Sequence, residues 1–105
     1  MTFLDRDPNI ALAGLRIELE RSLATLVFRF VPRKDAPFRS LVSMTTDLRD
    51  HGVISQSEQE ALKKVIATCN RAVHAQHVPL DVAHEIARLG QAMLGVLDTK
   101  MTSTH

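Results

Sequence analysis

The stretch Cys69-Asn70-Arg71-Ala72-Val73-His74-Ala75-Gln76-His77 contains the one cysteine of the chain and two of its five histidines. It lies at the end of a segment whose apolar residues recur at helical spacing. Ser55-Gln56-Ser57-Glu58 has the form of a capping box that starts this helix, and Pro79 stops it. We therefore expect a helix that the preceding residues position and the following residues cover.

Three further helices account for nearly all of the remaining sequence. Asp7-Pro8 opens the first, which runs to about Val31, where Pro32 stops it. The second follows the turn-rich residues 32–37 and ends at His51-Gly52, because glycine suits the left-handed position after a helix. The fourth begins at Pro79. Their expected core positions share the helical period: Leu12, Leu15, Leu19, Leu23, Leu26, Phe30, Phe38, Leu41, Val42, Met44, Leu48, Leu62, Val65, Ile66, Cys69, Val73, Val82, Ile86, Leu89, Met93 and Leu97.

Short connections between these segments predict an all-α fold, an antiparallel up-and-down bundle of four helices. At 105 residues the chain has room for a single domain, which we place at residues 1–98. Residues 99–105 are polar and without pattern, so we expect a frayed tail. In the last helix, the small residues Ala83, Ala87 and Gly90 form a row that lets another helix come close.

The first helix is apolar on two opposite sides. One side is a leucine seam, and the other contains Ile10, Gly14, Ile17, Ala24, Phe28 and Val31, interrupted by Arg21. A four-helix fold leaves no obvious element to cover the second side. We therefore expect a homodimer that forms through Ile10, Ile17, Ala24 and Phe28.

Composition limits the classes of function. The net charge of +1 gives no global electrostatic case for nucleic-acid binding, so any basic site has to be local. A single cysteine excludes an intramolecular disulfide and fits a reducing compartment. No apolar run approaches the length of a membrane span, and the N-terminus lacks the apolar core of a signal peptide. These features predict a soluble cytoplasmic protein without a membrane partner.

The residues of the Cys69–His77 stretch divide between the core and a polar flank of the helix. At 100° per residue, Cys69 falls in the apolar stripe, whereas Lys63, Asn70 and His74 share one flank with Arg71 further towards solvent. These groups can hold a phosphodiester and move protons around it. In the alternative interpretation, the asparagine and histidine brace the turn before Pro79, while the cations are solvated.

The segment Asn70-Arg71-Ala72-Val73-His74, near the end of the third helix, resembles the HEPN superfamily, most closely its small uncharacterised bacterial members. The resemblance spans about Pro8 to Leu97 and includes Leu15-Arg16-Ile17-Glu18-Leu19-Glu20 and Gly52-Val53-Ile54-Ser55. It implies a dimerising helical bundle. Many HEPN proteins are metal-independent RNases; others bind RNA or nucleotides, or accompany nucleotidyltransferases in toxin–antitoxin pairs.

The resemblance assigns roles to single residues. His74 matches the family histidine, the candidate general base or acid, and Asn70 matches the motif asparagine, but Cys69 stands where the family has arginine. Arg71 and His77 fit a looser form of the motif. The resemblance thus implies RNA or nucleotide binding through Lys63, Asn70, Arg71, His74 and His77, with weak or degenerate RNase activity in a toxin–antitoxin or defence setting. The alternative is a non-catalytic dimerisation or protein-interaction module.

Metal binding has ligand types but no geometry in its favour. Cys69, His74, His77 and His84 are residues that zinc prefers. Cys69 and His74 nevertheless point about 140° apart around one helix, so they do not converge. A buried thiol is also a poor nucleophile. We therefore expect no metal site and no cofactor.

Overall fold

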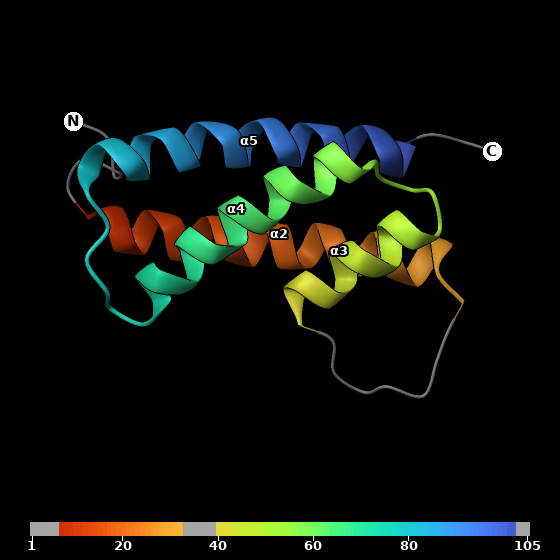
Figure 1. The fold of residues 1–105 in the computed structure, drawn as a ribbon, viewed down its shortest axis with the longest axis horizontal. Helices are drawn as coiled ribbons and strands as arrows, with labels where there is room; N and C mark the ends of the chain where they lie inside the picture. Colours follow the sequence, from red (N-terminus) through yellow and green to blue (C-terminus); the bar gives the residue numbers. More distant parts are fainter. Residues whose placement is uncertain (1–6, 33–39, 103–105) are drawn as a thin grey trace.

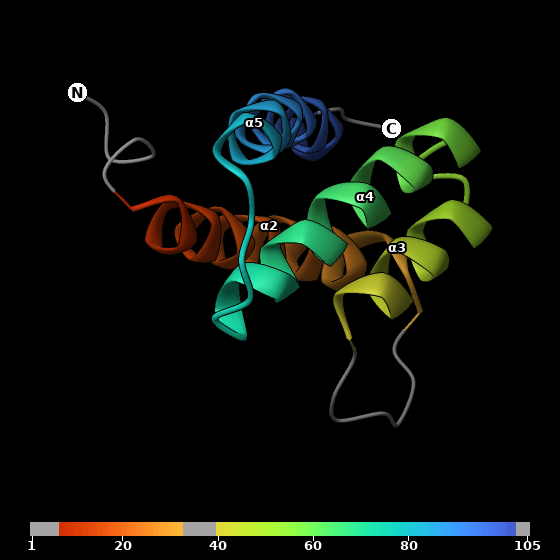
Figure 2. The same cartoon turned by 60° about the vertical axis from the view of Figure 1, so that its left-hand side comes forward.

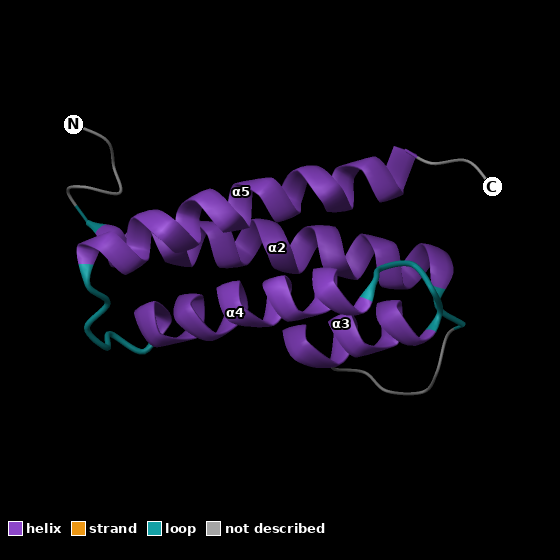
Figure 3. Ribbon diagram, turned by 45° about the horizontal axis from the view of Figure 1, so that its top comes forward, coloured by secondary structure: helices purple, strands orange, loops and turns teal. Residues whose placement is uncertain are grey.

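The computed structural model describes residues 7–32 and 40–102, and this part of the chain is helical without strands (Figure 3). Its four helices are α2 (Pro8–Phe30), α3 (Leu41–Asp50), α4 (Gln56–Val73) and α5 (Leu80–Thr102). The predicted all-α class is confirmed. None of these helices is long and apolar enough to cross a membrane.

The predicted N-terminal caps are present. Asp7 Oδ1 accepts the backbone N–H of Ile10 at 3.2 Å, which satisfies one of the free donors at the start of α2. At the start of α4, Ser55 Oγ accepts the N–H of Glu58 at 3.1 Å, and Glu58 Oε1 accepts the N–H of Ser55 at 2.8 Å. That backbone hydrogen bond is the main reason why the pKa of Glu58 lies below its usual value. Both helix starts were therefore encoded locally.

The turn between α3 and α4 also follows its sequence. Gly52 adopts φ of +73°, and the N–H of Val53 donates to the carbonyl of Leu48 at 2.8 Å. The two helices are further joined by a polar contact that the sequence did not reveal. Gln59 is 3% exposed and accepts from Arg49 Nη1 at 2.9 Å.

Two helix ends differ from the prediction. The last residue of α4 is Val73, and His74 is its C-cap. Ala75 then adopts a left-handed φ of 57°, so α4 ends well before Pro79. The N–H of Gln76 closes this end on the carbonyl of Arg71 at 2.9 Å. The second difference is at the end of α5. We expected fraying from Thr99 onward, but the helix continues to Thr102.

The long helix α2 contacts each of the other three helices, whereas α3 does not touch α5. Its leucine seam fills the core, and each fully buried leucine contributes roughly 1.5–3 kcal/mol. The close approach expected at the small row of α5 occurs at Gly90. A Cβ added there would lie 2.4 Å from Cδ2 of Leu15.

The helices do not alternate in direction, which corrects the predicted up-and-down order. Figure 1 shows α2, α3 and α5 running one way and α4 running back. Arg29 near the end of α2 donates to the carbonyl of Met101 near the end of α5, so these two helices are parallel. Residues 33–39, which lie between α2 and α3 in the sequence, are outside the described part of the chain.

Several core assignments were wrong at the edges of helices. Val42 and Val73 are 39% and 49% exposed, because α3 is covered only by α2 and α4, and Val73 is the last residue of its helix. Conversely, Val31 was placed on the outer side of α2 and is 8% exposed. It follows the helix as its C-cap and has left the helical period. Phe38 lies outside the described residues.

Candidate functional site

The flank of α4 predicted to be polar lies against α2. Arg16 of α2 donates from Nε to Asn70 Oδ1 at 2.8 Å, and its Nη1 lies 3.8 Å from Glu20 Oε2. The Arg16 side chain is 32% exposed, so it is partly covered but still accessible to solvent. We call Arg16, Lys63, Asn70 and His74 the polar flank.

His74 and Lys63 occupy the two ends of the polar flank. His74 is exposed just beyond α4, and its backbone N–H donates to the carbonyl of Asn70 at 3.1 Å. Lys63 is exposed about three turns before His74 on the same helix and forms no ion pair within the described residues. The side chains available to a ligand are therefore an imidazole and an ammonium, with the guanidinium of Arg16 between them along α4.

Arg71 and His77 come together, but through the backbone. Arg71 Nη2 donates to the carbonyl oxygen of His77 at 2.9 Å. This contact ties the end of α4 to the turn that follows it. Arg71 therefore braces the turn, a role that the alternative interpretation gave to Asn70 and His74 while it left the cations solvated. His77 itself is exposed and lies outside any helix.

Cys69 lies in the core, as predicted. It is 0% exposed, and burial raises the pKa of its thiol to about 11, against the opposing effect of the positive charge of Arg16. The thiol is therefore neutral at physiological pH and cannot serve as a nucleophile.

Arg16 is the residue that sequence reasoning missed. It brings a guanidinium next to Asn70 from a helix 54 residues earlier in the chain. Spacing within one helix could not reveal that contact. Its only sequence signal was its place at the border between the buried and outer sides of α2. No three His, Cys, Asp or Glu side chains gather as metal ligands would within the described residues.

A second candidate surface lies on the side of α2 that faces away from the core. No other described helix covers it (Figures 1 and 2). Its three large apolar side chains are well exposed: Ile10 at 53%, Ile17 at 57% and Phe28 at 80%. We call this surface the outer face of α2, and it comprises Ile10, Gly14, Ile17, Arg21, Ala24 and Phe28.

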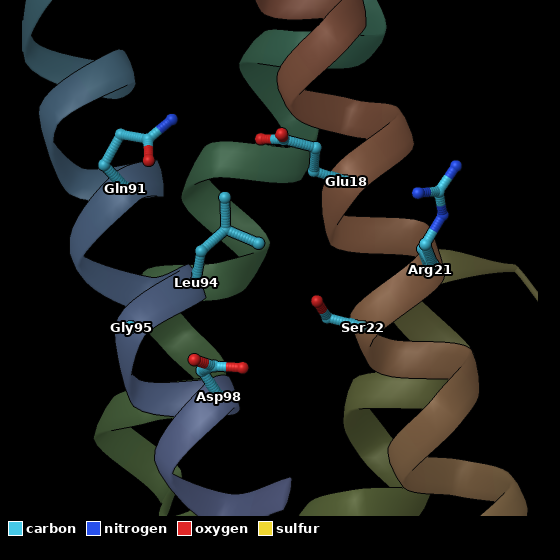
Figure 4. A pocket seen from close by; sticks show the side chains of 7 residues that line it. All are labelled: Glu18, Arg21, Ser22, Gln91, Leu94, Gly95 and Asp98. Carbon is cyan, nitrogen blue, oxygen red and sulfur yellow. The ribbon is translucent and has the colours of Figure 1, made fainter.

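A shallow groove of about 430 Å³ runs between α2 and α5 along one edge of the outer face. Figure 4 shows Glu18, Leu94 and Asp98 directed into it, while Arg21 points away from α5. The groove is open and not an enclosed cavity, and two of its seven lining residues carry carboxylates. The lining residues are Glu18, Arg21, Ser22, Gln91, Leu94, Gly95 and Asp98.

Comparisons with protein-family models, with curated proteins and with solved structures found no match.

Proposed function

We propose that this chain is a non-catalytic helical dimerisation module, which pairs with a second copy of itself through the outer face of α2. One observation carries the proposal: Ile10, Ile17 and Phe28 are exposed in line on the side of α2 opposite its buried leucines. Large apolar side chains exposed together on one helix face are typical of an interaction site.

The energetics favour covering this surface. Removing apolar surface from water is worth about 25 cal/mol per Å². A helix of 23 residues is ~35 Å long, so the outer face can meet a partner helix over its whole length. The same surface presented by two copies forms an isologous interface with closed twofold symmetry.

The contacts of Asn70 and Arg71 also support a non-catalytic role. Asn70 accepts from Arg16, and Arg71 is bound to the carbonyl of His77. Both residues thus hold elements of the fold together, which is a structural role.

Sedimentation equilibrium of the purified chain tests the proposal. We expect the mass of a dimer at micromolar concentration and the mass of a monomer for Ile17→Glu, because the glutamate would bury its charge in the interface. Leu80→Glu is the matched control, since Leu80 is 47% exposed but lies on α5. It should remain dimeric. A monomeric wild type at high micromolar concentration would rule the proposal out.

A second candidate function is binding of RNA or a nucleotide at the polar flank, for which we propose His74 as the proton-transferring group. The observation that favours it is the guanidinium of Arg16 beside Asn70, where the motif helix itself has only Cys69. A guanidinium and the ammonium of Lys63 are groups that hold phosphate. The resemblance to HEPN proteins supports the same class of ligand.

Fluorescence anisotropy with a labelled single-stranded RNA at low salt separates the two candidates, because phosphate contacts are strongest there. If the polar flank binds RNA, His74→Ala should weaken binding several-fold, while Arg88→Ala, which removes an exposed charge from α5, should have little effect. Cleavage of the same RNA by wild type but not by His74→Ala would indicate RNase activity. Equal weak binding by all three proteins would exclude the polar flank as the site.

A further inference from the structure

We propose that the two α2 helices of the dimer pair antiparallel, with Arg21 of each copy bound to Glu18 of the other. This inference rests on the proposed dimer and specifies its register. Ile10 of one copy lies opposite Phe28 of the other, Gly14 lies opposite Ala24, and Ile17 lies opposite Arg21.

The spacing of the outer face allows this register. Its six residues, from Ile10 to Phe28, are separated by alternating steps of four and three positions. That is the heptad spacing by which two helices keep a common seam in contact. Because the steps read the same in both directions, an antiparallel pair places every residue of the outer face opposite another residue of the same face.

The sizes of the side chains match in the same register. The two bulky apolar residues at the ends, Ile10 and Phe28, meet each other. The two small residues, Gly14 and Ala24, also meet and let the backbones approach. Gly14 has no neighbour within 4 Å of an added Cβ in its own chain, so packing within the chain does not explain its small size.

A parallel pair would be less favourable. It would place each residue opposite the same residue of the other copy. The two Arg21 side chains would then lie at the same level between the two outer faces. Like charges across an interface repel and select against such a pairing. In the antiparallel register the two arginines are offset by about one helical turn, and each lies at the level of Ile17 of the other copy.

Glutamates beside the outer face of α2 are candidate partners for these arginines. Glu18 and Glu20 flank the centre of the outer face on its two sides. Glu20 lies 3.8 Å from Arg16 of its own chain. Neither Glu18 nor Arg21 forms an ion pair through its side chain within the described residues. Glu18, which follows Ile17 directly, is thus the available carboxylate next to Arg21 of the second copy.

Disulfide cross-linking tests the register. In oxidising buffer, an equimolar mixture of Ile10→Cys and Phe28→Cys should form a covalent dimer, whereas neither variant alone should. Native Cys69 is buried and does not interfere. A mixture of Ile10→Cys with Leu80→Cys is the control and should stay monomeric on a denaturing gel.

The result distinguishes failure of the register from failure of the dimer. Cross-linking of each variant alone, with no heterologous product, would overturn the antiparallel register while sedimentation still shows a dimer. A monomeric wild type in sedimentation would overturn the proposed function itself, and the register with it.

Charge exchange tests the ion pairs. Glu18→Arg and Arg21→Glu should each raise the dimer dissociation constant about tenfold, because each homodimer then contains two like-charged contacts. Mixing the two variants should restore affinity to within about threefold of wild type, since both contacts again join opposite charges. Equal affinity of the single variants and the mixture would overturn the assignment of Arg21 to Glu18.

Discussion

At the scale of single residues, Cys69 is a residue of reactive type in an unreactive setting. It lies on the same helix as Asn70 and His74 but is 0% exposed, and its thiol has a pKa of about 11. At pH 8 only about one thiol in a thousand is then ionised, and that one is covered by the core.

We therefore predict that Cys69 does not react with a chromogenic thiol reagent at pH 8 in the native protein. One equivalent should react after unfolding in denaturant. The matched control is Val73→Cys, which places a thiol at a position 49% exposed on the same helix. That variant should release one equivalent rapidly in the native state. Rapid reaction of the native wild type would contradict the burial of Cys69.

The same residues show what the helical period can and cannot predict. The period placed Cys69 in the core and Asn70 on a flank, because both statements concern directions around a single helix. It could not supply Arg16, whose contact with Asn70 depends on how α2 packs against α4. A side chain that reaches a site from another helix is determined by tertiary packing.

At the scale of helices, the two left-handed residues form a natural comparison. Gly52 has φ of 73° after α3, and Ala75 has φ of 57° after α4. An L-residue with a Cβ pays about 1–2 kcal/mol in this conformation, whereas glycine adopts it readily.

We predict that Ala75→Gly raises the free energy of unfolding by up to ~1 kcal/mol and that Gly52→Ala lowers it by about 1 kcal/mol. Urea denaturation of the two variants and of wild type measures both effects. If Ala75→Gly instead destabilises the protein, the end of α4 does not have the left-handed conformation described above.

Helix packing gives a second comparison within α5. A methyl group on Gly90 would meet the buried side chain of Leu15, whereas one on Gly95 would meet nothing within 4 Å. Overpacking of a core costs typically about 1–3 kcal/mol, and replacing an exposed helical glycine by alanine gains about 0.5–1 kcal/mol.

Gly90→Ala should therefore lower the urea midpoint, and Gly95→Ala should raise it. Circular dichroism should show unchanged helical content in both variants. Stabilisation by both substitutions would mean that α2 and α5 do not approach closely at Leu15.

Helix boundaries were predictable where local chemistry decides them and not elsewhere. The capping box at Ser55 and the glycine turn at Gly52 are short-range signals, and both were confirmed. The end of α4 was predicted from Pro79, but the helix stops several residues earlier at a residue that is not glycine. Nothing in the preference of Ala75 indicates a left-handed conformation, so the surrounding structure must impose it.

At the scale of the whole molecule, the predicted alternation of helix directions was wrong. Four helical segments with short links suggested alternation, yet α2 and α5 run in parallel (Figure 1). The order of the helices along the sequence does not fix the direction in which each one packs. Among the described residues, the packing against α3, α4 and α5 nevertheless leaves the outer face of α2 uncovered, and that face was identifiable from its period alone.

The proposed dimer makes stability depend on protein concentration. Association of folded chains favours the folded state by mass action, so the thermal midpoint should rise with concentration. For a dimer of this size we expect a rise of roughly 3 °C for each tenfold increase, measured by circular dichroism from low to high micromolar concentration. Ile17→Glu should have a midpoint that does not change with concentration, because its core residues are untouched and only the interface is lost. Leu80→Glu, whose exposed side chain lies outside the outer face, should keep the slope of wild type. A wild-type midpoint that stays constant across this range would contradict the proposed dimer, because the midpoint of a monomer does not depend on its concentration.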